Sequence, residues 1–563
     1  MKPSSTYSDI IKNLTFGVKR TKNFQNLNKN NENELRMRVI PDDHDDTINK
    51  KPKMDEESES SDDEGVKIFS TEAPKQPNNQ EKIKKQKEEE KADELRKANR
   101  IFTWGTQIPA PFLNFSDLNL PEIFLKNLET YKIKEPSPIQ MQSIPIMMEG
   151  REIMASAPTG SGKTLAFIIP IMNDILKVRE KNVNSSIKKS SKKKKNNNNN
   201  NSNYLKALII QPTKILAKQT YLSFIKFTDG LDIKIQNLED QVIKEDTDIL
   251  ITTPNKFIFT MKEYSKDIVS KLRWLVVDES DRLFETTESD KDTDFRSQLG
   301  EIYTLCNSTT IKHAFFSATF SGAVENWCKE NLNDVIHVCI GMKNTSNTNV
   351  KQELVFAGTE QGKVSTLKAM LRSGFNPPAI VFVQSKDRAK QLYVELRDSF
   401  KNINIALITS DVSDKNKDVL LEKFRIGNIF VLICTELLGR GLDVTGVNLV
   451  VNYDLPTSII SYIHRVGRTG RAGKVGRAIT YFTEDDIERI KPIATVIHQA
   501  GYEVPEYTLK VKKLSRRKIA DLKKKAPERK DIRKIFSTDK KGITKKKKKF
   551  IKKLENKEKS VTK

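Results

Sequence analysis

Short β-branched runs that alternate with longer stretches of helical periodicity constrain the fold of this 563-residue chain more than any other feature. Such alternation is typical of βα units, in which helices connect parallel strands. The first set of runs comprises Ile153–Ser156, Leu205–Ile210, Ile249–Thr252, Leu272–Val277 and His313–Phe316. The second set, after the polar stretch Gly341–Asn349, comprises Ala379–Val383, Ile403–Thr409, Ile429–Cys434, Val447–Asn452 and Ala478–Phe482. We therefore predict an α/β protein with two tandem parallel-sheet domains.

Composition sets the expected boundaries of these domains. Residues 1–100 are rich in Asn, Lys, Asp, Glu and Ser and lack a sustained apolar period, so we expect a disordered N-terminal extension. We place the first domain at 101–342, the second at 349–507 and a basic, Lys-rich tail at 508–563. A Lys/Asn-rich stretch at 181–203 cannot form a core, and it is predicted to be a disordered surface insertion in the first domain.

The positive charge of the chain is concentrated in two segments. The net charge is +24, of which residues 510–563 carry +19 and residues 181–206 carry +8. A near-neutral body with two basic appendages indicates a polyanionic partner such as nucleic acid. Because the tail has no interleaved aromatic residues, it is interpreted as a sequence-independent electrostatic tether, and equally as a nuclear or nucleolar address.

Cysteine usage argues against a structural zinc protein, and hydropathy argues against a membrane protein. Cys306, Cys328, Cys339 and Cys434 form no CxxC pair or Cys/His cluster, so we expect reduced buried thiols and no structural zinc. The longest aliphatic stretches are far shorter than the ~18 residues of a membrane span. We therefore expect no signal peptide and no membrane partner.

A phosphate-binding loop is the most specific local signal. The segment Ala155–Thr164 follows the first apolar run and precedes a stretch of helical periodicity. Glycines in such a loop let the backbone wrap around a phosphate, and the following helix N-terminus adds a positive dipole end. Lys163 would reach the β- and γ-phosphates of a nucleotide, and the Thr164 hydroxyl would bind Mg²⁺. The predicted nucleotide-binding residues are Ala157, Pro158, Thr159, Gly160, Ser161, Gly162, Lys163 and Thr164.

Ala157 replaces the first glycine of the general pattern, so a glycine-rich turn without this function is the alternative. The acidic partner of the loop is expected at the end of the run Trp274–Asp281, Trp-Leu-Val-Val-Asp-Glu-Ser-Asp. Asp278 is predicted to bind the metal, and Glu279 to orient or deprotonate the attacking water. For an isolated Asp-Glu pair, an acidic cap on the next helix would be the alternative.

These two motifs and six others, in order from Phe115 to about Gly501, resemble the DEAD-box ATP-dependent RNA helicases of superfamily two. The resemblance implies two RecA-like domains that use ATP and Mg²⁺. Glu135–Gln140 is similar to the Q motif, which implies that Gln140 binds adenine and that Phe115 stacks on it. Without the resemblance, Phe115 would be a core residue and Gln140 a surface helix residue.

Further residues take their predicted roles from this resemblance. Ser317 and Thr319 correspond to the hydroxyls that bond Asp281 and couple ATP state to strand separation. Asp443 corresponds to the residue that binds the ATP ribose. The residues that correspond to RNA contacts are Pro212, Thr213, Thr253, Pro254 and Thr435. The pairs Lys214-Ile215 and Asn255-Lys256, with Glu436 and Gly439, depart from the family pattern.

The second domain supplies a basic motif. Tyr462–Gly473 is similar to motif VI, and Ile380–Ser385 resembles motif IV. Arg468 and Arg471 correspond to fingers that reach the γ-phosphate and stabilise transition-state charge. Without the resemblance, the Gly/Arg stretch would be a flexible basic loop. The predicted catalytic residues are Lys163, Asp278, Glu279, Arg468 and Arg471.

Flanking segments narrow the expectation. Gly105–Phe112, Ser137–Pro145, Gly150–Glu152 and Ala155–Pro158 resemble the nucleolar branch that acts in small ribosomal subunit biogenesis. That branch implies pre-rRNA and pre-ribosomal proteins as partners, in the nucleus and nucleolus, and a monomeric chain is expected. The predicted function is RNA-stimulated ATP hydrolysis with local strand separation. The alternatives are an ATP-gated RNA clamp or scaffold that does not unwind and, more weakly supported, a DNA helicase.

Overall fold

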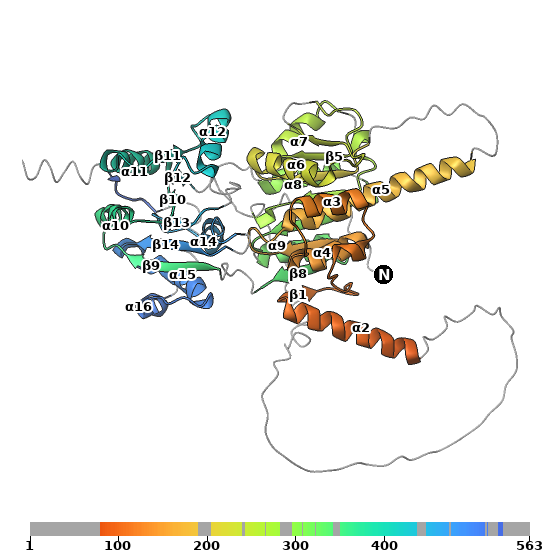
Figure 1. Ribbon diagram of the computed structural model, residues 1–563, viewed down its shortest axis with the longest axis horizontal. Coiled ribbons are helices and arrows are strands. Elements are labelled where there is room, and N and C mark those ends of the chain that lie inside the picture. Colours follow the sequence, from red (N-terminus) through yellow and green to blue (C-terminus); the bar gives the residue numbers. More distant parts are fainter. Residues whose placement is uncertain are drawn as a thin grey trace, which may run out of the picture. The chain divides into compact units, whose positions relative to one another are not determined.

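The computed structural model contains two parallel-sheet domains (Figure 1). The residues that it describes are 79–189, 204–238, 242–264, 266–281, 295–306, 308–320, 322–341, 349–435, 446–471, 474–512, 515 and 527–532.

The sheet of the first domain has eight strands in the order β1-β8-β2-β7-β6-β3-β5-β4. Its strands are β1 (Ile101–Trp104), β2 (Ile153–Ser156), β3 (Ala207–Ile210), β4 (Ile235–Asn237), β5 (Ile249–Thr252), β6 (Trp274–Val277), β7 (Lys312–Ser317) and β8 (Ile336–Ile340). The five runs expected from the sequence are β2, β3, β5, β6 and β7. All pairings are parallel except that of the edge strand β1, which runs antiparallel to β8.

Helices cover both faces of this sheet because successive strand residues point to opposite sides. On β3, Ile209 packs with the helices α3 to α6, whereas Leu208 and Ile210 pack with α7 to α9. The helical elements of the domain are η2 (Phe115–Leu118), α3 (Glu122–Thr130), α4 (Pro138–Met148), α5 (Lys163–Lys189), α6 (Lys214–Thr228), α7 (Pro254–Met261), η3 (Lys266–Val269), α8 (Phe295–Leu305) and α9 (Gly322–Asn331).

The sheet of the second domain has six parallel strands in the order β11-β12-β10-β13-β14-β9. They are β9 (Val350–Phe356), β10 (Ala379–Val383), β11 (Ile405–Ile408), β12 (Val431–Thr435), β13 (Leu449–Asn452) and β14 (Gly476–Phe482). The helical elements are α10 (Glu360–Arg372), α11 (Lys386–Ser399), α12 (Asp414–Arg425), α14 (Ile459–Val466), η5 (Glu484–Asp486), α15 (Ile487–Gln499) and α16 (Glu506–Lys510). The predicted fold class, two tandem parallel-sheet domains, is confirmed.

Parts of the segments expected to be disordered are helical instead. Helix α2 (Asn79–Ala98) lies within residues 1–100, and α5 continues through residues 181–189. Near its end α2 is held to the first domain, because Ala92 is buried and Arg96 donates to Gln142 and to the Pro109 carbonyl. Charged residues have adequate helix propensity, so composition alone did not exclude these helices. Residues 1–78 and 190–203 lie outside the described part of the chain.

Two further features concern the cysteines and the length and hydropathy of the described helices. Cys306, Cys328, Cys339 and Cys434 are all buried, and none forms a disulfide bond within the described part of the chain. Among the described helices, none combines the length and the apolar character that crossing a membrane requires.

Candidate active site between the two sheets

The phosphate-binding loop joins β2 to α5 at the carboxyl end of the first sheet. Gly160 and Gly162 adopt φ angles of +78° and +92°, a region that residues with a Cβ rarely occupy. A Cβ at Gly162 would lie 2.4 Å from Nε2 of Gln140. The buried Ser161 Oγ has no hydrogen-bond partner among the described residues. This loop therefore has both the backbone shape and the polar capacity to hold a phosphate chain.

Lys163 lies inside the curve of this loop. Its Nζ donates to the carbonyl oxygens of Ala157 at 2.8 Å and Pro158 at 3.1 Å. Burial lowers the pKa of Lys163, and the nearby carboxylates of Glu279 and Asp278 partly oppose this effect. The side chain is thus a buried cation next to the acids, positioned by the first turn of α5.

The acidic residues follow β6, the neighbour of β3. Asp278 Oδ2 accepts a hydrogen bond from Gln211 Nε2 at 3.0 Å. Burial, together with the adjacent charge of Glu279, raises the pKa of Asp278 to about 6. Glu279 has a left-handed φ of +48°, which is a strained conformation for this residue type. The buried Asp278 and the adjacent, partly exposed Glu279 repel each other and form a donor set suited to a hard divalent cation, and Thr164 lines the same cavity.

Asp281, the last residue of this acidic segment, contacts side chains of both domains. Thr319 Oγ1 donates to Asp281 Oδ2 at 2.8 Å, and Ser317 Oγ accepts from the Thr319 backbone N–H. From the second domain, His464 Nε2 lies 2.9 Å from Asp281 Oδ2 and 3.8 Å from Glu279 Oε2. The cluster of Glu279, Asp281 and His464 has the spacing of a metal site, although one member comes from the second domain.

Arg468 and Arg471, in the turn after helix α14, face this loop. A cavity of about 290 Å³ is lined by Lys163, Asp278 and Glu279 and also by Arg468 and Arg471. Thr159 Oγ1 donates to the Gly467 carbonyl at 2.9 Å. The Nε atoms of the two arginines donate to backbone carbonyls of His464 and Gly467, which fixes the direction of each side chain. All five residues predicted to be catalytic therefore line one cavity.

The predicted adenine-binding residues are placed differently. Gln140 is buried on α4, where its Nε2 donates to the Gly162 carbonyl and its Oε1 accepts from the Ser137 backbone N–H. The structure thus brings Gln140 against the phosphate loop rather than to the surface. Phe115 is buried in the first core cluster and packs on Phe112 at a ring distance of 5.7 Å. Its stacking on adenine stays a prediction.

The residues predicted to contact RNA lie at strand ends and helix N-termini. Thr213 caps α6 and its Oγ1 accepts from the Leu216 backbone N–H at 3.3 Å. Thr253 is the N-cap of α7, and Pro254 is the first residue of that helix. Thr435 ends β12 and is buried. Pro212 precedes the Thr213 cap, whereas Asp443, Glu436 and Gly439 lie outside the described residues.

Sequence reasoning missed two residues of this site. His464 was passed over because the spacing argument used only the arginines around it. Gln211 directly follows β3. Its Nε2 donates to Asp278 Oδ2 and to Thr220 Oγ1, so it holds the Asp278 carboxylate in place. A polar residue directly after a buried parallel strand was the available signal, since ligand sites lie at the carboxyl ends of such strands.

Comparisons with known proteins agree with this geometry. Residues 137–327 match the DEAD/DEAH box helicase family, and residues 362–473 match the helicase conserved C-terminal domain. The chain is 40% identical over 476 residues to the probable ATP-dependent RNA helicase DDX52 of Rattus norvegicus, covering 81% of this chain and 75% of that protein. It is 35% identical over 471 residues to the ATP-dependent RNA helicase ROK1 of Saccharomyces cerevisiae, covering 80% and 78% respectively.

Solved structures share the fold. Dbp5 of S. cerevisiae bound to RNA and ADP BeF3 superposes with a TM-score of 0.56 and 23% identity over 71% of this chain and 94% of that chain. The DEAD-box helicase Mss116 bound to ssRNA and UDP-BeF gives a TM-score of 0.58 and 22% identity over 72% and 84%. With both helicase domains matched and the five residues predicted to be catalytic lining one cavity, the chain belongs to the DEAD-box family of ATP-dependent RNA helicases.

Proposed function

We propose that this chain hydrolyses ATP in response to RNA and thereby separates short RNA duplexes. The observation that carries the proposal is the single cavity lined by Lys163 and Asp278 from the first domain and by Arg468 and Arg471 from the second. Because the two halves of the site belong to different domains, hydrolysis requires the domains to come together. RNA and ATP that both favour this arrangement must tighten each other's binding.

Each side chain has a definable task at this site. Lys163 and the loop N–H groups bind the phosphates of ATP, while Arg468 and Arg471 supply positive charge where the transition state is negative. Glu279 orients the attacking water and accepts its proton. Asp278 and Thr164 would hold Mg²⁺, which would supply positive charge to neutralise the phosphates. Asp281 and Thr319 relay the arrangement of this site to the second domain through His464.

The test is ATP hydrolysis by the purified chain without nucleic acid, with single-stranded RNA and with matching DNA. We expect stimulation by RNA only, and its loss in Glu279→Gln. Glu129→Gln, an exposed change on α3, is the matched control and should behave like the wild type. Equal stimulation by DNA would contradict the RNA assignment. RNA stimulation without separation of a short duplex would favour the alternative, an ATP-gated clamp.

We further propose that the substrate is pre-rRNA in the nucleolus and that small-subunit pre-ribosomal proteins are partners. The segments Gly105–Phe112 and Ser137–Pro145 support this narrower assignment, and so does the strongly basic tail. Crosslinking of the tagged chain to RNA in cells should enrich pre-rRNA, and imaging should place the chain in the nucleolus. Predominant crosslinks to messenger RNA would overturn this part of the proposal.

The Lys-rich tail is proposed to act as an electrostatic tether. Replacing the five lysines at 545–549 by glutamine removes five positive charges from it. We expect weaker RNA binding and a shallower salt dependence, because each lost phosphate contact lowers the slope of log K against log salt by about 0.7 for single strands. Unstimulated ATP hydrolysis should stay unchanged, and an unaltered salt slope would reject the tether.

A further inference from the structure

A short segment near the C-terminus, Pro527–Ile532, follows the last helix of the second domain in the sequence and packs on that domain. Gln384 Nε2 donates to the Pro527 carbonyl at 2.7 Å, and an Arg388 Nη donates to the Lys530 carbonyl at 2.6 Å. The Ile532 side chain is completely buried in the core beneath α10 and α11. Its backbone N–H donates to Gln391 Oε1 at 2.8 Å. The segment therefore has main-chain and side-chain anchors on one face of this domain.

Arg529 inserts into a buried acidic cluster. Its side chain is 3% exposed and lies 3.0 Å from Glu360 Oε1 and 2.8 Å from Asp486 Oδ1. Its Nε also donates to Gln384 Oε1 at 2.7 Å. A guanidinium with three separate acceptors is held in one orientation, which lysine could not reproduce.

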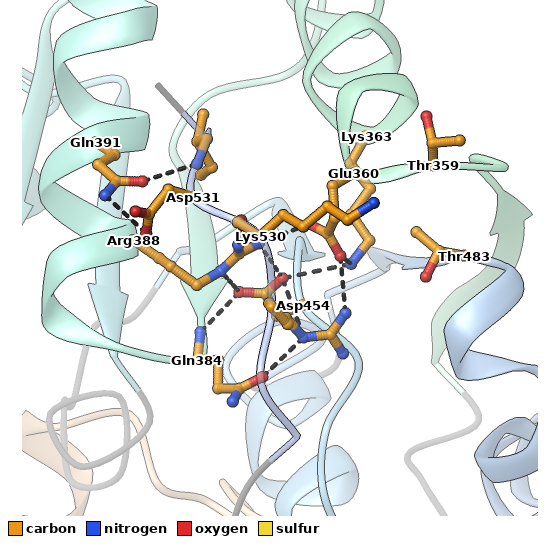
Figure 2. A network of polar contacts seen from close by, with 12 residues as sticks. Thr359, Glu360, Lys363, Gln384, Arg388, Gln391, Asp454, Thr483, Lys530 and Asp531 are labelled. Atoms are coloured by element: carbon orange, nitrogen blue, oxygen red, sulfur yellow. Dashed lines mark hydrogen bonds and ion pairs between the residues drawn. The ribbon is translucent and has the colours of Figure 1, made fainter. Parts of the chain in front are cut away.

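The cluster contains three buried acids and three buried cations. Asp454 stands at its centre, in contact with Arg388 and with the Gln384 backbone N–H (Figure 2). Lys363 contacts Glu360 and Asp454, and Arg529 completes the set. Arg489, at the rim with a side chain 16% exposed, also pairs with Asp486. Removing Arg529 would leave buried carboxylates short of partners, which is strongly unfavourable.

The charges of the cluster support this view. Burial alone would raise the pKa of Asp454, but Arg388, Lys363 and Arg529 together hold it below its ordinary value. Burial would likewise raise the pKa of Asp486, and the hydrogen bond and charge of Arg529 are the leading effects that lower it. Both carboxylates therefore depend on the C-terminal arginine for part of their compensation.

The cluster is connected to helicase motifs on both of its sides. Gln384 belongs to the motif IV segment between β10 and α11, and Ser385 caps that helix. Asp454 is linked to motif VI, because Arg465 on α14 donates to the Asp454 carbonyl at 3.0 Å. The same helix carries His464, which contacts Asp281 of the ATP site. Arg529 is thus linked to α14 through Asp454 and Arg465, and both finger arginines follow α14 in the sequence.

We propose that Arg529 is a positioning residue, through which the C-terminal segment 527–532 completes the second helicase domain and holds the motif IV turn and α14 in their working orientation. The proposal rests on the function proposed above, since its readout is RNA-stimulated hydrolysis. The anchored segment lies within the Lys-rich tail at 508–563, so the proposal holds this part of the tail on the second domain.

The test compares Arg529→Met with Lys530→Met in the full-length chain. Both changes remove one positive charge from adjacent positions, but the Lys530 side chain is exposed. We expect Arg529→Met to melt about 5–10 °C lower, from the size of a broken buried ion pair and the usual dependence of Tm on stability. At a temperature where the variant is fully folded, its RNA-stimulated kcat should fall about tenfold while the KM for ATP stays within about twofold.

Two further variants separate positioning from stability. Arg529→Lys keeps the charge but loses the planar fork, so it should recover the melting temperature more than the kcat. Glu360→Gln combined with Arg529→Met removes one acid along with the lost cation, and it should recover part of both. A lower melting temperature with wild-type kcat in the folded range would overturn the positioning role, as would Arg529→Met behaving like Lys530→Met. If the wild type shows no RNA stimulation, the proposed function fails, whereas the melting comparison still tests the anchor.

Discussion

Two buried aspartates at corresponding strand ends have opposite electrostatic surroundings. Asp278 follows β6 in the first domain, and its pKa is raised to about 6 by burial and by Glu279. Asp454 follows β13 in the second domain, where Arg388, Lys363 and Arg529 outweigh burial and lower its pKa. A carboxylate compensated by fixed guanidinium groups is part of the scaffold. A carboxylate left beside another acid is suited to bind a cation that arrives with a ligand.

The same contrast separates the arginines. Arg388 and Arg529 are engaged by carboxylates inside the second domain. Arg468 and Arg471 instead use Nε on backbone carbonyls and line the cavity that also contains Lys163 and Asp278. The domain therefore uses one pair of arginines for its own structure and directs another pair into the cavity.

The largest expected effect is on the arginines that line the cavity. Arg471→Ala should lower RNA-stimulated kcat at least about 10³-fold, because an arginine finger stabilises charge that develops only in the transition state. Its melting temperature should stay near that of the wild type. Arg477→Ala, which removes an exposed pair with Glu353, is the control and should keep nearly full activity. Similar activities of these two variants would break the distinction between scaffold and finger arginines.

The two aspartates provide the next test. Asp454→Asn should lower the free energy of unfolding by about 3–5 kcal/mol, because it leaves buried cations without their partner. Asp278→Asn should leave it unchanged or raise it slightly, since the change relieves repulsion with Glu279. Urea unfolding of both variants in EDTA, followed for each domain, measures the difference. Equal losses would mean that the environments of the two carboxylates are not distinct.

The comparison also marks what the sequence could predict. The runs that form β2, β3, β5, β6 and β7 are fully buried or nearly so, and their apolar pattern was sufficient to find them. Strand β4 has only three half-buried residues, and β1 is an antiparallel edge strand. Neither leaves a strong periodic signal, so both were missed. Strand β8 was missed as well, although it is buried up to Cys339, and so was β9, most of whose residues are half-buried or exposed.

The candidate ATP site could be proposed from the sequence because each of its parts is a local motif. The phosphate loop, the acidic box and the arginine turn each lie within about ten residues, and family resemblance put them in one cavity. The Arg529 cluster has no such local signal. Arg529 lies 75 residues after Asp454 in a Lys-rich stretch, whose average composition conceals a buried Ile532 and an arginine with a buried side chain. Only the fold reveals which of the many basic residues in this stretch pairs with buried carboxylates.

The smallest expected effect uses two cysteines as reporters of the two domains. Cys306 lies in the core of the first domain and Cys434 on β12 in the second. Burial raises the pKa of each thiol to about 12, so both should react slowly with thiol reagents in native buffer. In Arg529→Met, labelling of Cys434 should speed up about tenfold, because local opening of the second domain becomes easier. Labelling of Cys306 should not change. Mass spectrometry of the labelled peptides measures both rates, with Lys530→Met as the control. Equal acceleration at both cysteines would show that the C-terminal arginine stabilises the whole chain. The second domain, whose buried charges pair with one another, would then no longer differ from the first domain, whose acids are suited to bind a cation.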